Sequence, residues 1–220
     1  MSKLTIALAF TGLCLLITGC SQTLQRQTCV ELAADVSYCL APITQQVLGA
    51  KLIDDSLLEE NQTAVSATQK VSIQTQDSQH ELLSQLELEP QQLTLVGLAP
   101  LGQALFTLTY DGNTLISEQS QLLGDQFKAE YLLAIMQLIY WPDASVNPNL
   151  QGAKMQSYDC DSALCRGLFF ANNKAKNGTI DSAADKQPII AIRYSNLDKW
   201  QAHVSLSIDA ANFKLSISPL

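Results

Sequence analysis

The stretch LTLVGLAPLGQALFTLTYDG, residues 93–112, contains two predicted strands and the turn that joins them. Apolar, β-branched and aromatic residues dominate 93–98 and 102–110, as they do in β-strands. Ala99-Pro100-Leu101 separates the two runs, and Asp111-Gly112-Asn113 after the second run is a strong hairpin signal. The stretch therefore predicts consecutive antiparallel strands joined by short turns.

The sequence on either side extends this pattern to five strands. Residues 69–76 alternate apolar and polar side chains, 80–89 place leucines on one face, and 114–119 follow the Asp-Gly-Asn turn. Such an up-and-down sheet has one apolar face, which must be buried against another layer.

The next segment, Asp125 to Tyr140, supplies that layer. Its sequence DQFKAEYLLAIMQLIY predicts a helix with Asp125 as its cap and Trp141-Pro142 at its end. Its apolar face is wider than a normal stripe, which is typical of a helix buried on more than one side or lying over a lipid-filled space. The residues at helical spacing, which are the candidate groove or lid residues, are Phe127, Tyr131, Leu132, Ile135, Met136 and Ile139.

Strands resume after a loop rich in Pro, Asn and Asp at 142–151. The expected strands are 153–158, 167–171, 188–195, 203–209 and 213–218. No internal repeat or low-complexity linker interrupts the chain, so the sequence predicts one α+β domain over residues 29–220, with strands wrapping a helix.

The N-terminal sequence MSKLTIALAFTGLCLLITGC is typical of a secretory signal. One basic residue, Lys3, precedes an apolar run that is short for a spanning helix, and small residues follow it. The ending Ile17 to Cys20 resembles a bacterial lipobox, which implies removal of residues 1–19 and acylation of Cys20. In that resemblance Ser21 favours the outer membrane, and 20–28 becomes a lipidated tether.

Four cysteines remain after Cys14 and Cys20 are set aside. An even number in an exported protein indicates disulfides, and four cysteines allow three pairings. Cys29–Cys39 and Cys160–Cys165 are the expected pairs, because both close short loops. A zinc site is the alternative, but it requires closer paired spacing.

Charge excludes one large class of partner. The formal net charge is -8, with 47% hydrophobic and only 15% charged residues. Nucleic-acid affinity depends on Lys and Arg neutralising phosphates, and this chain has no basic run. The apolar material is ample for a core and is compatible with a cavity.

Catalytic motifs are missing from the sequence. It contains no Gly-x-Ser-x-Gly elbow, no His-Glu-x-x-His and no phosphate-binding glycine loop. His80 and His203 start predicted strands, where a surface position is expected. Asp159 and Asp161 supply too few carboxylates for a calcium ion, which takes six to eight oxygens. We therefore expect no enzyme activity, no cofactor and no metal.

A resemblance to a known group adds to this picture. The lipidated cysteine, the meander containing LTLVGLAPLGQALFTLTYDG, the long apolar helix and the C-terminal strands around PIIAIRYSNLDKW resemble the LolA/LolB periplasmic lipoprotein carriers. The pattern is similar, more closely, to small outer-membrane lipoproteins associated with aryl-polyene lipid pathways. The resemblance implies a curved antiparallel sheet, an incomplete β-barrel, covered by an apolar helix.

The resemblance also implies a role for one loop. In LolB a Pro-Leu-Gly loop exposes a leucine that promotes transfer of cargo into the membrane, and Pro100-Leu101-Gly102 matches it. The expected function is therefore a carrier or acceptor of lipid or lipoprotein acyl chains on the periplasmic face of the outer membrane, working with a LolA-like carrier. The alternative is a structural or assembly lipoprotein whose helix fills its own groove and which binds a protein partner.

Overall fold

The computed structural model describes residues 22–43, 64–123, 128–171 and 187–220. The expected meander is confirmed, since five consecutive strands pair antiparallel with their neighbours in sequence. They are β4 (Val65–Gln74), β5 (Gln79–Leu88), β6 (Leu93–Leu98), β7 (Ala104–Tyr110) and β8 (Leu115–Gln119). Leu88, Leu93, Leu95, Leu108 and Leu115 are buried on the inner face, which explains the alternation in the sequence.

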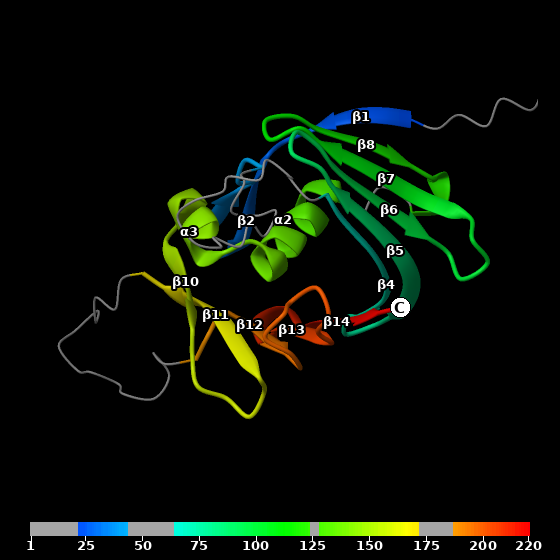
Figure 1. Cartoon of the computed structure of the whole chain (residues 1–220). Coiled ribbons are helices and arrows are strands. Elements are labelled where there is room, and N and C mark those ends of the chain that lie inside the picture. The colour runs from blue at the N-terminus through cyan, green and yellow to red at the C-terminus, as the bar shows by residue number, and fades with distance from the viewer. Residues whose placement is uncertain (1–21, 44–63, 124–127, 172–186) are drawn as a thin grey trace, which may run out of the picture.

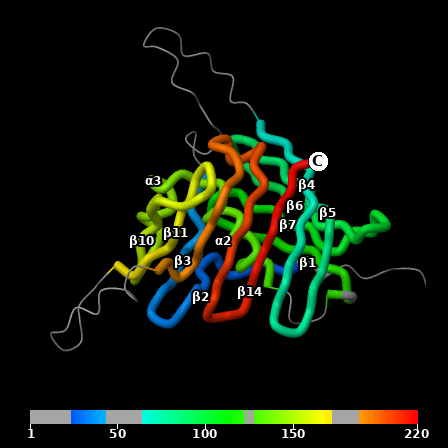
Figure 2. The backbone as a smooth tube through the Cα atoms, turned by 90° about the horizontal axis from the view of Figure 1, so that it is seen from below, coloured from blue at the N-terminus to red at the C-terminus, as the bar shows by residue number. Residues whose placement is uncertain are grey.

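A second meander at the C-terminus joins the first into one sheet. Its strands are β10 (Ala153–Ser157), β11 (Leu164–Phe170), β12 (Ile190–Tyr194), β13 (Val204–Ile208) and β14 (Phe213–Pro219). Strand β14 pairs with β4, as Figure 2 also shows, so the last strand closes onto the first strand of the other meander. Among the described residues, the sheet has eleven strands in the order β1-β8-β7-β6-β5-β4-β14-β13-β12-β11-β10.

The segment expected to be a tether begins the sheet instead. Residues Gln22–Arg26 form β1, which pairs antiparallel with β8 at one edge. The pairing holds through backbone hydrogen bonds, which a polar sequence without clear periodicity makes as well as an apolar one. The Arg26 side chain adds bonds to Ser117 Oγ at 2.8 Å and Gln119 Oε1 at 2.6 Å.

A small second sheet was not predicted from the sequence, and its third strand lies in the segment 142–151 that was expected to be a loop. It comprises β2 (Cys29–Ala33), β3 (Val36–Cys39) and β9 (Leu150–Gln151), in that order. Cys29 lies opposite Cys39 in the hairpin, and both expected disulfides, Cys29–Cys39 and Cys160–Cys165, are present.

The long helix is α2 (Ala129–Tyr140), and it lies inside the curve of the large sheet (Figure 1). Ten of its twelve residues are buried, in agreement with the wide apolar face of its sequence. It ends as expected before Trp141-Pro142, and its N-cap is Lys128; the expected cap, Asp125, lies outside the described residues. The short helices in the described ranges are α3 (Asp143–Val146) and the 3-10 turns η2 (Gln121–Leu123), η3 (Asn147–Asn149) and η5 (Asp209–Ala211).

The fold is thus an open, curved, mostly antiparallel sheet with few helices. The two ends of the strand order are β1 and β10, on opposite sides of the opening. One buried cluster combines inner-face residues of the sheet with α2 and the small sheet, and it includes Leu86, Leu133, Leu138 and Ile192.

Candidate functional site

The turn between β6 and β7 presents Leu101 to solvent. The Gly102 N–H donates to Ala99 O at 2.8 Å, and Gly102 has φ +84° whereas Leu101 has no positive φ. Proline second in the turn and glycine fourth suit a type I turn followed by a left-handed residue, the usual three-residue hairpin loop. Leu101 lies at the tip of this turn, beyond the two faces of the sheet, and its side chain is 98% exposed.

This turn lies at the same end of the sheet as the start of β1. Gln22 is opposite Gln119 at the end of β8, and Gln119 is opposite Phe106 close to the start of β7. The β7 strand begins directly after the Leu101 turn. The start of β1 therefore lies at the end of the sheet where Leu101 is exposed. In Figure 1 the start of β1 and the turn between β6 and β7 both lie on the right of the view.

The candidate groove residues of α2 divide into two groups. Ile135, Met136 and Ile139 are buried, whereas Tyr131 and Leu132 are half-buried. Phe127 and the expected lipidation site Cys20 lie outside the described residues. The Tyr131 hydroxyl donates to the carbonyl of Glu31 in β2. The half-buried positions belong to the first turn of the helix, and the buried ones lie farther along it.

Buried polar groups fix the C-terminal end of α2. Arg166 of β11, 2% exposed, donates from one guanidinium nitrogen to the carbonyls of Leu138 and Ile139, at 3.0 Å each. Its Nε donates to Asp143 at 2.9 Å. The Tyr194 hydroxyl also donates to the Ile139 carbonyl, at 2.6 Å. A positive charge at this end matches the negative pole of the helix and satisfies carbonyls that have no partner within it.

Gln137 connects the middle of the helix to the segment after β3. Its amide donates to Ala41 O at 2.9 Å and accepts from Ala41 N and the Tyr38 hydroxyl at 2.8 and 2.7 Å. Burial raises the pKa of Tyr38, so its hydroxyl stays protonated and donates. Sequence reasoning missed Gln137 and Arg166. A polar residue inside an otherwise apolar helix, and a single arginine inside LCRGLFF, are the signals that could have found them.

Lys199 lies near the same helix end and gives the protein a pH dependence. Its ammonium donates to Trp141 O at 3.4 Å. Burial, and then the charge of Arg166, lower its pKa to about 8 from 10.5, while Asp143 acts in the opposite direction.

Because the folded state holds fewer protons than the unfolded state between pH 8 and 10, we expect the stability contributed by this residue to rise across that range. Chemical denaturation of wild type and Lys199→Met at several pH values measures it. The wild type should gain free energy of unfolding relative to the variant. The raised pKa of Tyr140, about 12, acts in both proteins and cancels in the difference. The prediction would be contradicted if the free energies of unfolding of the two proteins changed with pH by the same amount.

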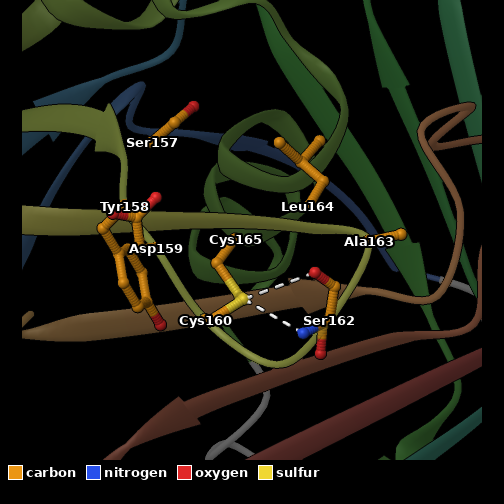
Figure 3. A pocket seen from close by; sticks show the side chains of 8 residues that line it. All are labelled: Ser157, Tyr158, Asp159, Cys160, Ser162, Ala163, Leu164 and Cys165. Atoms are coloured by element: carbon orange, nitrogen blue, oxygen red, sulfur yellow. Dashed lines mark hydrogen bonds between the residues drawn. A yellow bond between two sulfur atoms is a disulfide. The ribbon is translucent and has the colours of Figure 1, made fainter.

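A hollow of about 250 Å³ lies at the hairpin between β10 and β11 (Figure 3). The Cys160–Cys165 disulfide cross-links the hairpin loop, and the Cys160 sulfur accepts a hydrogen bond from the Ser162 N–H at 3.3 Å. Its lining is Ser157, Tyr158, Asp159, Cys160, Ser162, Ala163, Leu164 and Cys165. It is open and polar, and it is not the apolar groove that the sequence predicts.

Other candidate residues lie apart from each other. His80 and His203 are both exposed, and His203 Nδ1 is 3.1 Å from Ser218 Oγ. In the part of the chain that the structure describes, no three residues among His, Cys, Asp and Glu are placed to hold a metal ion. Within the same ranges, none of the helices has the length and apolarity to cross a membrane.

Comparison with known proteins gives a family without a described activity. None of the curated proteins matches the chain. A family model described as "Protein of unknown function (DUF3261)" matches residues 66–220, from β4 to the last residue. The match includes the Leu101 turn, α2 and the Arg166 contacts, and it leaves out β1 to β3. Because it spans more than half of the chain, this protein belongs to that family of unknown function.

Proposed function

We propose that the protein is a LolB-like lipoprotein, anchored through Cys20 on the periplasmic face of the outer membrane, that accepts or carries acyl chains of lipid or lipoprotein. Aryl-polyene lipids are one candidate cargo, and a periplasmic LolA-like protein is the expected donor. The observation that carries the proposal is Leu101, almost fully exposed at the tip of a hairpin between Leu93 and Tyr110 that contains no charged residue.

The place of the anchor supports a role for Leu101 at the membrane. One residue, Ser21, separates Cys20 from β1, and β1 starts at the end of the sheet that carries the Leu101 turn. Acyl chains on Cys20 hold this end of the sheet against the bilayer. A leucine that enters the apolar layer then gains about 1.5–3 kcal/mol from burial. No nucleotide is required, because an acyl chain is equally dry in a protein groove and in a bilayer.

The binding surface in this proposal is the concave face of the sheet, against which α2 packs. The helix is held at its C-terminal end by Arg166, Tyr194 and Gln137, and its first turn includes the half-buried Tyr131 and Leu132. Acyl chains would therefore enter at the first turn, with the C-terminal end as the fixed point.

The decisive experiment exchanges an exposed leucine for glutamate at each end of the sheet. We expect Leu101→Glu to lower transfer of a lipidated cargo into liposomes by about tenfold or more, since a buried leucine is worth at least 1.4 kcal/mol. Leu197→Glu is the control. Leu197 is 73% exposed and lies before the start of β13. The other end of β13 leads to β14, whose first residues pair with Gln74 beside the turn at 75–78. Successive turns of a meander lie at alternate ends of the sheet, so the turns at 75–78 and at Leu101 share one end, and Leu197 lies at the opposite end.

Equal rates for both variants and the wild type would contradict the role of Leu101. Purified protein that retains no acyl chain in mass spectrometry, after incubation with a lipidated donor, would contradict the carrier function as a whole.

A second function is favoured by the packing of α2. Leu133, Leu138 and Ile139 have no exposed surface, so the helix itself fills the described part of the concave side. A protein with such a core would act as a structural or assembly lipoprotein, and the Leu101 turn would contact a protein partner. In that case Leu101→Glu would abolish co-purification of the partner and leave lipid transfer unchanged.

A further inference from the structure

Two polar side chains stand next to each other on the apolar inner face of the sheet. Gln69 of β4 and Ser84 of β5 are directly opposite in the antiparallel register. They are 1% and 4% exposed, and the inner-face positions along their strands are Ala67, Val71, Leu82 and Leu86. The pair therefore interrupts an otherwise apolar surface at the middle of both strands.

Neither residue has its hydrogen bonds complete. The Gln69 amide nitrogen donates to the Tyr140 hydroxyl at 2.7 Å, but its Oε1 has no partner among the described residues. The Ser84 hydroxyl also has none in that part of the chain. If the Gln69 amide were rotated by 180°, its nitrogen would lack a partner in place of its oxygen. One polar atom of the amide is therefore without a hydrogen bond in either orientation. Buried polar groups without partners are rare and lower stability.

The neighbours of the pair leave these atoms without alternatives. On one side Gln69 faces Pro219, and on the other Ser84 faces Gly97, neither of which has a polar side chain. The Phe106 ring lies over Gly97, where a Cβ would come within 2.2 Å of it. The Tyr140 ring stacks on Trp200 with the centroids 4.1 Å apart. The Gln69 Oε1 acceptor and the Ser84 hydroxyl, which can donate and accept, therefore lack partners in apolar and aromatic surroundings.

We infer that Gln69 and Ser84 form a binding site for a hydroxyl group, carried by the acyl cargo of the proposed function. A hydroxyl supplies the donor that Gln69 Oε1 lacks and an acceptor for Ser84, which a hydrocarbon chain cannot do. The inference rests on the proposed function, because the cargo must lie along the concave face. It adds a substrate class: hydroxylated acyl chains are preferred over plain ones.

Matched fatty acids test the inference on the full-length protein. Competition against a fluorescent fatty acid should show that wild type binds β-hydroxymyristic acid, or a mid-chain hydroxystearic acid, about fivefold to tenfold more tightly than the corresponding plain acid, the effect expected of one buried hydrogen bond. Ser84→Ala should reduce this ratio to about one. The control Gln85→Ala changes the adjacent, exposed position of β5 and should keep the preference.

Fold stability separates the site from a merely structural serine. Ser84→Ala removes a hydroxyl without a partner, so its thermal midpoint should equal or exceed that of wild type. Equal affinities for plain and hydroxylated acids in wild type would overturn the inference and leave the carrier function standing. Failure to bind either acid would overturn both. An ordered water bonded to both side chains in a crystal of the loaded protein would assign the site to solvent and overturn the inference.

Discussion

Replacing Arg166 with methionine lowers the free energy of unfolding by about 3 kcal/mol, which corresponds to about 6–12 °C in the thermal midpoint of a chain of this size. The side chain is buried and satisfies two carbonyls at the end of α2 as well as Asp143. Methionine fills a similar volume but removes the donor to the Leu138 carbonyl and leaves the Ile139 carbonyl with the Tyr194 hydroxyl alone. The loss stays near the lower limit for a buried ion pair, because Asp143 is partly exposed and remains solvated.

The control for this variant is Lys70→Met. Lys70 pairs with Glu81 at 3.0 Å, but both side chains are about half exposed, so the change should be below about 1 kcal/mol. Urea denaturation followed by circular dichroism measures both variants. Similar losses in the two would contradict the role assigned to Arg166. Arg166→Lys should lie between them, because lysine keeps the charge but cannot reach both carbonyls and Asp143.

Gly152→Ala is expected to destabilise the protein by about 4 kcal/mol or to prevent pairing of β9 with β3. Gly152 has φ +78°, and a Cβ there would come within 1.9 Å of the Asp35 carbonyl oxygen. That atom belongs to the backbone of the turn between β2 and β3, so it cannot rotate away. The penalty therefore combines the left-handed conformation, about 1–2 kcal/mol, with displacement of a whole turn.

Gly102→Ala provides the matched comparison. Gly102 has nearly the same φ, +84°, but an added Cβ meets nothing within 4 Å. The Gly102→Ala variant should lose only about 1 kcal/mol of its free energy of unfolding, which is the cost of the left-handed conformation alone. Thermal unfolding of both variants separates the steric effect from the conformational one. If the two midpoints fell equally, the close approach of Asp35 would have no energetic consequence.

The strands were predictable because their signals are local. Hairpin residues such as Asp111-Gly112 and the alternation in 93–98 depend on neighbours in sequence, and the observed strands start and end within a few residues of the expected ones. The end of α2 was predictable for the same reason, since Trp141-Pro142 terminates a helix by its own chemistry.

What could not be predicted depends on long-range contacts. Strand β1 is polar, and only its pairing with β8, some ninety residues later, makes it a strand. The small sheet likewise needs Leu150 beside Tyr38. The Gln69 and Ser84 pair requires the register of β4 and β5, because nothing in the sequence places two isolated polar residues opposite one another. Leu101 could be singled out from its turn motif, whereas its position near the start of β1 follows only from the sheet order.

The pairing of β14 with β4 has a consequence for folding during synthesis. The chain is made from its N-terminus, so the ten residues of β4 appear with a free hydrogen-bonding edge that β14 later occupies. Until β14 emerges, that edge is open to strands of other molecules, and such edges promote aggregation. A newly made molecule therefore passes through an aggregation-prone interval that ends when β14 pairs with β4, and shielding by a chaperone is most useful until then.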